Sequence, residues 1–309
     1  MGLRIKPFNS VPIPVVIAHV GGAPSYLKHS LESAARFNRD VVLIGDESNQ
    51  GIWRNHWNRD GVESTKYKAF LDSYTKLSDY PDAYEQAFWE RPFMVEAWMR
   101  AERVEELFLL DSDVLTFADY SREVVPVLPD NCQATLIMPA GDQEIGQLWS
   151  SLHFSYWKRE ALDDFNTFIV NAYRDREMRS RLEAKYRWHI DHHQPGGVCE
   201  MTLLYYWARN NNGKVSNLAE VIGGSVADLA VTQSNNYFDN EYGMHRGFKR
   251  LVFRNGVPFG FNQVLRKEVR FWCLHCQGNA KGAMHLLRRP GLRAFFPDLY
   301  RIAQLQKAR

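Results

Sequence analysis

The first half of the chain alternates between short apolar runs and segments with helical spacing. A β-branched run at residues 15–20 ends in Gly21 and Gly22, and a second apolar run occupies residues 41–45. Between them, residues 25–37 place apolar side chains at the intervals of a helix. A strand, a glycine-containing turn, a helix and a second strand are the typical opening of a parallel sheet with flanking helices. The pattern therefore predicts an α/β fold.

A third apolar run, residues 107–110, leads directly into Asp111, Ser112 and Asp113. Four consecutive apolar residues bounded by a polar turn indicate a central strand of a parallel sheet. Open α/β sheets bind ligands at the carboxyl ends of such strands, which is where the two acids are expected. Asp46 ends the preceding strand in the same way, and either contacts a ribose or base or simply marks a polar strand end.

A helical pattern begins at Arg91 and continues towards the strand that precedes Asp111. Because Pro92 follows directly, and proline is tolerated in the first turn of a helix, Arg91 is expected near the helix N-terminus, where anions are favoured. Donor contact and a structural ion pair both remain open for this side chain.

Residues 51–90 are rich in aromatic and charged side chains without clear periodicity, which predicts an excursion over the sheet that carries short helices. Packing in the core and stacking on a nucleobase or a sugar ring are both open for its rings. The aromatic residues concerned are Trp53, Trp57, Tyr67, Tyr74, Tyr84 and Trp89.

The second half contains a charged helical stretch at residues 160–187, a polar segment at residues 188–197 and a helix at about residues 200–209. Asn255-Gly256 between two apolar runs predicts a hairpin, because both positions of the turn tolerate positive φ. Residues 286–309 predict a basic helix, with a solvated face or contact with anionic lipid as its open roles. No repeat or linker is visible, which favours a single domain.

Composition narrows the class of protein. The 309 residues are 45% hydrophobic and 24% charged, with a formal net charge of +2, which does not favour binding to nucleic acid in bulk. The N-terminal residues show neither a signal peptide nor a membrane anchor. Four cysteines and no N-glycosylation sequon favour a reducing, cytoplasmic location. Peripheral membrane contact through the basic C-terminal helix is the open alternative.

Asp111 and Asp113 have a spacing suited to cation binding. Side chains alternate along an extended backbone, so residues i and i+2 point the same way and two carboxylates can share one hard cation. The simpler interpretation is that polar residues end a buried strand. Their expected position at the end of a central strand favours a site for a metal and a phosphate.

A second set of chemical groups lies far downstream, at His275, Gly278 and Lys281. An imidazole completes a metal shell begun by carboxylates, glycine lets the backbone approach a phosphate, and lysine supplies a charge for a diphosphate oxygen. Cys273 and Cys276 also form a CxxC motif, so a redox or zinc site is the alternative. In a strand, however, residues three apart face opposite sides, and no second cysteine pair completes a zinc site.

Together these segments resemble the nucleotide-sugar-dependent glycosyltransferases of the GT-A fold, in particular the bacterial and glycogenin-like enzymes that combine a DxD motif with a late HxxGxxK motif. The matching segments follow the family's order over most of the chain. They are His19 followed by PSYL, WERPF at 89–93, DSDVL at 111–115, GGVCEMTLL at 196–204 and LHCQGNAKG at 274–282. Gly282-Ala283 departs from the Pro-Trp that usually follows the lysine in glycogenin-like enzymes, so donor preference and anomeric outcome stay open.

The resemblance implies a single GT-A (Rossmann-like) domain with a mostly parallel central sheet, flanking helices and an acceptor-side subdomain. Residues 1–120 would bind the nucleotide sugar, and residues 121–285 would form the acceptor side and complete the metal site. Residues 286–309 would form the basic C-terminal helix.

The resemblance also implies a site for Mn²⁺ or Mg²⁺ and for a UDP-sugar as co-substrate. Asp113 and His275 would bind the metal, and Asp111 would reach either the metal or the donor ribose. Gly278 and Lys281 would hold the diphosphate. The further expected donor contacts are His19, Gly21, Asp46, Arg91 and Ser112. For His19, a hydrogen-bonded core histidine is the alternative.

Glu200 lies at the expected start of a helix, directly after a flexible turn. An acid at this place either only favours the helix dipole or, as in the resembling enzymes, approaches the sugar and the acceptor hydroxyl. Glu200 would then orient the acceptor, or act as the base if the reaction inverts. With Asp113 and Lys281 it completes the expected catalytic residues.

His189, Asp191 and His193 have a spacing that suits a separate metal site on either a helix or a strand. Pro195 and two glycines follow, so a polar loop near the acceptor cleft is the favoured interpretation.

The expected activity is metal-dependent transfer of a hexose from a nucleoside diphosphate sugar to a hydroxyl of a saccharide or glycoconjugate, as in polysaccharide biosynthesis, with retention favoured. A nucleotidyltransferase or nucleotide-sugar pyrophosphohydrolase would use the same groups around a diphosphate. That alternative is weakened because no glycine-rich phosphate loop follows the first strand. A non-catalytic sugar-binding protein is the third possibility, and it would require a decayed metal site.

Overall fold

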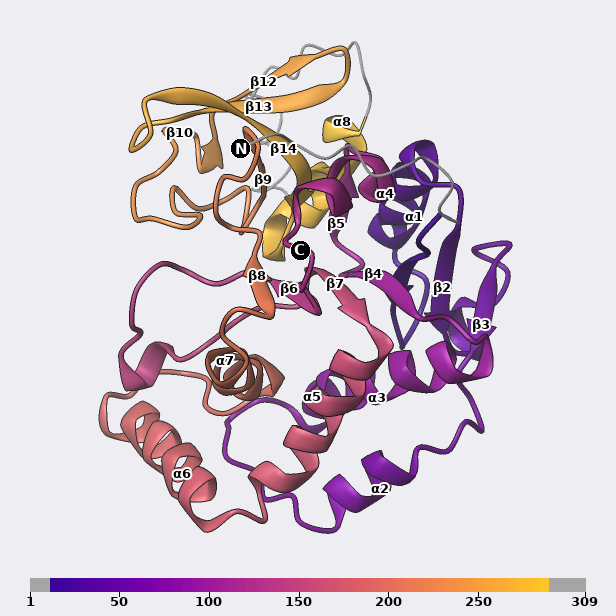
Figure 1. Cartoon of the computed structure of the whole chain (residues 1–309), viewed down its shortest axis with the longest axis vertical. Helices are drawn as coiled ribbons and strands as arrows, with labels where there is room; N and C mark the ends of the chain where they lie inside the picture. Colours follow the sequence, from indigo (N-terminus) through magenta and orange to yellow (C-terminus); the bar gives the residue numbers. More distant parts are fainter. Residues whose placement is uncertain (1–11, 289–309) are drawn as a thin grey trace.

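A seven-stranded sheet organises residues 12–288, the part of the chain that the computed structural model describes (Figure 1). Its strand order is β3-β2-β1-β4-β7-β6-β8. The strands are β1 (Val15–Ala18), β2 (Val41–Gly45), β3 (His56–Asn58), β4 (Glu106–Leu110), β6 (Ala134–Leu136), β7 (Phe154–Lys158) and β8 (Val215–Asn217). β1 lies between β2 and β4, and all pairs from β3 to β4 are parallel. β7 runs antiparallel to both β4 and β6, whereas β6 and β8 are parallel.

Helices cover both faces of this sheet, so the predicted α/β class with a mostly parallel central sheet is confirmed. The α-helices are α1 (Ser25–Phe37), α2 (Thr65–Leu71), α3 (Asp82–Ala101), α4 (Tyr120–Glu123), α5 (Arg159–Ala172), α6 (Arg176–Asp191), α7 (Glu200–Asn210) and α8 (Met284–Leu287). Short 3₁₀ helices are η1 (Glu47–Asn49), η2 (Val125–Val127), η3 (Ile145–Gln147) and η4 (Gly278–Ala283).

Side-chain alternation along the central strands produces two separate cores. Val16 and Leu109 point to the face covered by α2, α3, α5 and α7. Val15 and Leu110 point to the opposite face, which α1 and α4 cover. A strand buried on both faces needs apolar residues at successive positions, which explains why β1, β2 and β4 are continuous apolar runs rather than alternating patterns.

A second sheet stands at the other end of the molecule from α6 (Figure 1). Its strands are β5 (Val114–Thr116), β9 (Ser225–Ala227), β12 (Leu251–Arg254), β13 (Val257–Asn262) and β14 (Lys267–His275), and a separate short ribbon joins β10 (Met244–His245) to β11 (Phe248–Lys249). β12 and β13 form the hairpin predicted at Asn255 and Gly256, which both have positive φ. β5 pairs with β14, so the segment directly after Asp113 joins the strand that ends at His275.

The predicted helix at residues 25–37 is confirmed as α1, and the predicted helix at residues 200–209 is confirmed as α7. The predicted start of a helix at Arg91 is wrong, because α3 begins at Asp82, directly after Pro81, and contains Pro92 in its interior. Arg91 is consequently a mid-helix residue rather than a neighbour of the helix N-terminus. The aromatic excursion contains α2 and the first turns of α3, but it also supplies the edge strand β3.

The polar loop predicted at residues 188–197 is shorter than expected. α6 continues through His189 to Asp191, and only then does the chain turn, with His193 at a φ of 51°. Charged helix-forming residues before Trp188 propagate the helix into the histidine cluster, and Pro195 lies too far downstream to end it earlier.

The predicted basic C-terminal helix falls largely outside the described residues. Only its first three positions, Leu286 to Arg288, lie within them. The predicted division into residues 1–120, 121–285 and 286–309 stays a prediction. Across residues 12–288, no helix has both the length and the apolar character that crossing a bilayer requires.

Candidate metal and diphosphate site

The carboxyl ends of the neighbouring strands β2, β1 and β4 bring together residues that are far apart in the sequence. Asp46 follows β2, His19 follows β1, and Asp111 follows β4. The Nδ1 of His19 lies 3.0 Å from the Oγ of Ser112, which joins the ends of β1 and β4. This is the edge at which parallel sheets bind ligands, and the sequence predicted it.

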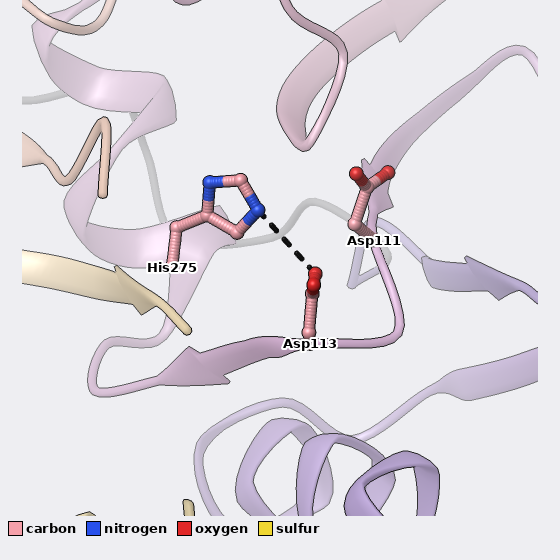
Figure 2. A group of neighbouring side chains, drawn as sticks. All are labelled: Asp111, Asp113 and His275. Atoms are coloured by element: carbon pink, nitrogen blue, oxygen red, sulfur yellow. Dashed lines mark ion pairs between the residues drawn. The ribbon is translucent and has the colours of Figure 1, made fainter. Parts of the chain in front are cut away.

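Asp111, Asp113 and His275 converge on one point (Figure 2). One ligand atom from each lies within 4.8 Å of the other two. His275 reaches the two acids because β5 and β14 pair with Val114 opposite His275, and because the Cys276 amide donates to the Asp113 carbonyl at 2.9 Å. Two carboxylates and an imidazole form a donor set that suits Mn²⁺, so these residues fit the cation that the sequence predicted.

Asp113 is the electrostatic centre of this group. Its carboxylate lies 3.4 Å from the Nε2 of His275 and 3.2 Å from the Nζ of Lys281, and its side chain is only 9% exposed. Burial on its own raises the pKa of Asp113, but the hydrogen bond and charge of His275, together with Lys281, hold that pKa well below its ordinary value. Asp113 is therefore an anion that two cationic or polar partners already stabilise.

The orientation of the His275 ring follows from its hydrogen bonds. Its Nδ1 lies 2.7 Å from the carbonyl oxygen of Leu229. A carbonyl only accepts, so Nδ1 carries a proton whether the ring is neutral or charged, and Nε2 is the nitrogen that faces Asp113. A second hydrogen bond of this type typically fixes the tautomer of a metal-binding histidine.

Arg91 links the two sides of the site. Its guanidinium forms an ion pair with Asp111, and its Nη2 donates to the Oε1 of Glu200 at 3.1 Å. Burial lowers the pKa of Arg91, but the adjacent charges of Asp111 and Glu200 outweigh burial and raise it. Of the two roles predicted for Arg91, the structural ion pair is present, and donor contact stays a prediction.

Glu200 begins α7, as predicted, and its side chain is almost completely buried. Burial raises the pKa of Glu200 to about 7, with a smaller opposing effect from Arg91 and a further upward effect from Asp111. The carboxyl group therefore titrates near neutral pH, where a group that exchanges a proton with a substrate is most effective.

The first βα turn is organised by Asp46. Its carboxylate accepts a hydrogen bond from the Gly21 amide at 2.7 Å and caps η1 through the Ser48 amide at 2.9 Å. Gly21 has a φ of 85°, a conformation that a residue with Cβ rarely adopts. Asp46 thus shapes the turn beside His19, and its contact with a ribose or base stays a prediction.

The HxxGxxK segment, His275 to Lys281, lies beside Asp113. Lys281 belongs to η4, and its Nζ also lies 4.8 Å from the centre of the Tyr26 ring. Gly278 is exposed, has a φ of 59°, and has no atom within 4 Å of where a Cβ would stand. Its backbone is open to an approaching ligand, and its contact with a phosphate stays a prediction.

Two alternative metal sites find no support in the described part of the chain. Between residues 12 and 288, the group of Asp111, Asp113 and His275 is the only cluster of at least three histidine, cysteine or acidic side chains that could hold a metal. Burial raises the pKa of both Cys273 and Cys276, which disfavours the thiolate that zinc or redox chemistry needs.

The sequence missed the residues behind His275. His153 stacks on the His275 ring with centroids 4.0 Å apart, and Asp228 accepts a hydrogen bond from the His275 amide at 3.0 Å. The buried Lys249 forms an ion pair with Asp228. No motif marks these positions, since each depends on how β9 and the following loop pack against β14.

Most rings of the aromatic excursion pack in the core, as Tyr67 and Trp89 do. Tyr84 differs, since it is 63% exposed. It lies within electrostatic range of Glu200 and Asp111. Contact with a sugar ring therefore stays a prediction for Tyr84.

No model of a known protein family matches this chain, and no curated protein sequence matches it significantly. Solved structures show partial likeness. The apo form of mouse xyloside xylosyltransferase 1 aligns at a TM-score of 0.43 with 9% identity over 67% of this chain and 84% of that one. The bifunctional glycosyltransferase WbbM aligns at a TM-score of 0.40 with 13% identity, over 75% of this chain and 42% of that one. The galactosyltransferase LgtC, in complex with donor and acceptor sugar analogues, aligns at a TM-score of 0.35 with 10% identity, over 66% of this chain and 73% of that one. Identities and scores this low do not decide the activity.

Proposed function

We propose that this protein is a metal-dependent glycosyltransferase of the GT-A fold, which transfers a hexose from a UDP-sugar to a hydroxyl of a saccharide or glycoconjugate with retention of configuration. One observation carries the proposal. Asp111, Asp113 and His275 have ligand atoms within 4.8 Å of one another, at the carboxyl edge of the parallel strands. The Nζ of Lys281 lies 3.2 Å from the carboxylate of Asp113.

Asp111, Asp113 and His275 would hold Mn²⁺ or Mg²⁺, which when bound supplies positive charge to the diphosphate as the anomeric bond breaks. Lys281 would stabilise the same developing charge, since its side chain is 36% exposed and its ammonium already lies 3.2 Å from Asp113. The open backbone at Gly278 would let the phosphates come close. His19, Gly21, Ser112 and Asp46, at the ends of β1, β2 and β4, would line the nucleoside pocket.

On the acceptor side, Glu200 would orient the hydroxyl that attacks. Arg91 holds Glu200 and Asp111 at once, which would fix the distance between the acceptor and the donor phosphates. In a retaining reaction the departing phosphate itself takes the acceptor proton, so Glu200 would position rather than act as a base. Its pKa of about 7 leaves it able to donate or to accept a hydrogen bond.

The test is to incubate the full chain with Mn²⁺ and a panel of sugar nucleotides, with and without saccharide acceptors, and to identify every product. The proposal expects nucleoside diphosphate and a new glycoside, both lost in Asp113→Ala. Release of nucleoside monophosphate and sugar phosphate would overturn it in favour of a pyrophosphohydrolase. Binding of sugar without any turnover would overturn it in favour of a non-catalytic protein.

A further inference from the structure

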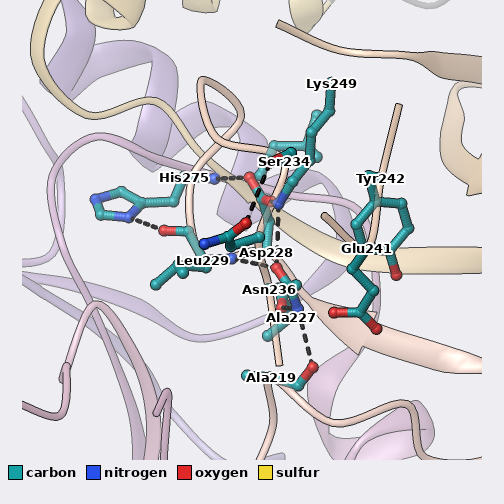
Figure 3. Close-up of polar contacts among 12 residues, drawn as sticks. Ala219, Ala227, Asp228, Leu229, Ser234, Asn236, Glu241, Tyr242, Lys249 and His275 are labelled. Carbon is teal, nitrogen blue, oxygen red and sulfur yellow. Dashed lines mark hydrogen bonds and ion pairs between the residues drawn. The ribbon is translucent and has the colours of Figure 1, made fainter. Parts of the chain in front are cut away.

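A buried polar cluster lies directly behind His275 (Figure 3). Its members are Asp228, Asn236 and Lys249, which are 0%, 1% and 0% exposed, and we refer to them as the Lys249 cluster. A lysine and an aspartate fully removed from water carry a large desolvation cost, which is offset only where geometry and hydrogen bonding are good. Their burial therefore needs a reason.

The Lys249 cluster fixes a short segment of backbone that follows β9. The Nζ of Lys249 donates to the Oδ1 of Asp228 at 2.5 Å and to the Oδ1 of Asn236 at 3.2 Å. The same Asn236 oxygen accepts from the Leu229 amide at 2.7 Å, while its Nδ2 donates to the carbonyls of Ala219 and Ala227 at 2.9 Å each. The peptide groups from Ala227 to Leu229 are thus held from several directions.

This segment in turn holds two imidazoles. The His275 amide donates to the Oδ2 of Asp228 at 3.0 Å, and the His275 Nδ1 donates to the carbonyl of Leu229 at 2.7 Å. The Nε2 of His153 donates to the carbonyl of Asp228 at 2.8 Å, and the two rings stack. Both the backbone and the ring of His275 are therefore anchored to the residues that Lys249 fixes.

We propose that the Lys249 cluster positions His275, so that the Nε2 lone pair is held towards Asp113 as the third ligand of a divalent cation. Asp228 and Lys249 are positioning residues in this arrangement, and neither one reaches the cation. The inference rests on the proposed function for the identity of the site as a metal site. It adds that affinity for the cation depends on a buried ion pair outside the ligand set.

The main test measures Mn²⁺ binding to the purified full chain by the electron paramagnetic resonance signal of free Mn²⁺. The double variant Asp228→Asn with Lys249→Gln removes both buried charges together, which avoids leaving one of them without its partner. We expect Mn²⁺ to bind it about 10- to 100-fold more weakly than the wild type, as loss of an outer-shell partner does. Thermal melting in EDTA shows whether the apo fold is intact.

Glu241→Gln is the matched control. Glu241 is also a buried carboxylate in this part of the fold, but it accepts from the amides of Tyr237 and Phe238 and from Asn262 instead. We expect the control to lower the melting temperature without weakening Mn²⁺ binding. A double variant that melts like the control and binds Mn²⁺ like the wild type would overturn the inference.

A metal-free measurement separates this inference from the proposed function, and it applies even if the double variant fails to fold. Nitrogen-15 shifts of His275 in the wild-type apo protein at alkaline pH report the tautomer, with His275→Asn used to assign the signal. We expect the proton on Nδ1. A neutral ring protonated on Nε2 alone would overturn the positioning inference, whereas an Nδ1 proton in a protein that binds no Mn²⁺ would overturn only the metal site.

Discussion

The two halves of the proposed metal site are held in different ways. On the carboxylate half, the side chain of Asp111 is 27% exposed and is held by Arg91, while Asp113 is held by Lys281. On the imidazole half, His275 is 9% exposed and is held by the backbone carbonyl of Leu229 and by the buried Asp228. Ion pairs with charged side chains hold one half, and buried contacts, one of them to a backbone carbonyl, hold the other.

The difference predicts which half would adjust if a cation binds. A cation near Asp111 and Asp113 would compete with Arg91 and Lys281 for the same oxygens, so these ion pairs would lengthen or rearrange. The hydrogen bonds of His275 lie on the far side of its ring and can stay as they are. The imidazole half is therefore the fixed reference, and the carboxylate half is the part that responds.

The largest expected effect comes from removing the central carboxylate. Asp113→Ala should lower turnover about 10³-fold, because it removes a ligand to the group that stabilises the leaving diphosphate. Release of nucleoside diphosphate at increasing Mn²⁺ concentrations measures the loss. Asp111→Ala is the comparison, and a smaller loss is expected there because Asp111 is also shared with Arg91. Equal turnover in Asp113→Ala and the wild type would contradict the assignment of this site.

Arg91 tests how far the carboxylate half depends on ion pairs. Arg91→Met leaves Asp111 and the buried Glu200 without their shared cation and should lower the free energy of unfolding by about 3 kcal/mol. Arg100→Met, in the same helix, removes ion pairs of a side chain that is 56% exposed, and should cost less than about 1 kcal/mol. Urea denaturation compares the two variants. Equal losses of unfolding free energy would show that the ion pairs of Arg91 stabilise the fold no more than those of the exposed Arg100 do.

The contribution of Glu200 to the free energy of unfolding should depend on pH. Because burial raises its pKa to about 7, the folded state binds this proton more tightly than the unfolded chain does. The stability that Glu200 contributes is therefore fully present below its ordinary carboxyl pKa and is lost as pH rises from there through about 7, a change on the order of 3 kcal/mol.

Glu200→Gln should remove this loss, so the difference in unfolding free energy between variant and wild type should grow from mildly acidic to neutral pH. A difference that does not change with pH would contradict the raised pKa. The same variant tests the chemistry, since turnover within about tenfold of the wild type agrees with retention, and a loss of several orders of magnitude would favour a base and inversion.

The smallest expected effect is at the exposed ring beside the site. Tyr84→Ala should raise the KM for a saccharide acceptor about threefold, the loss of a partly exposed aromatic contact, with little change in kcat or in donor KM. Phe261→Ala, which removes a ring that is 55% exposed on β13, is a control for general effects. An unchanged acceptor KM would leave Tyr84 as a packing partner of Tyr80 and Phe88 only.

The sequence was sufficient where the signal is local. Apolar runs predicted β1, β2 and β4, and the position of Asp111 and Asp113 directly after the third run predicted the edge at which they lie. Local signals also misled, since Pro92 suggested a helix start at a place where packing against the sheet keeps α3 continuous from Asp82. Tertiary contacts stabilise a helix with an internal proline, which residue patterns alone cannot reveal.

The support of His275 could not be predicted, for a physical reason. A lysine is ordinarily a surface residue, and only the packing of β9, β11 and β14 places Lys249 and Asp228 together without water. The approach of His275 to Asp113 was expected from the resemblance, but its tautomer depends on the carbonyl of Leu229, a backbone group that carries no sequence signal.

The pairing of β5 with β14 has a consequence for how the protein matures. Val114 and His275 are paired across antiparallel strands that lie far apart in the chain, and a slip of one residue would turn His275 to the opposite face of the sheet. The ligand set consequently does not exist until this long-range register is correct. If the proposed site binds Mn²⁺, the chain could not acquire the cation during synthesis before residues 267–275 have emerged and paired, and high-affinity uptake of Mn²⁺ would report that this pairing has formed.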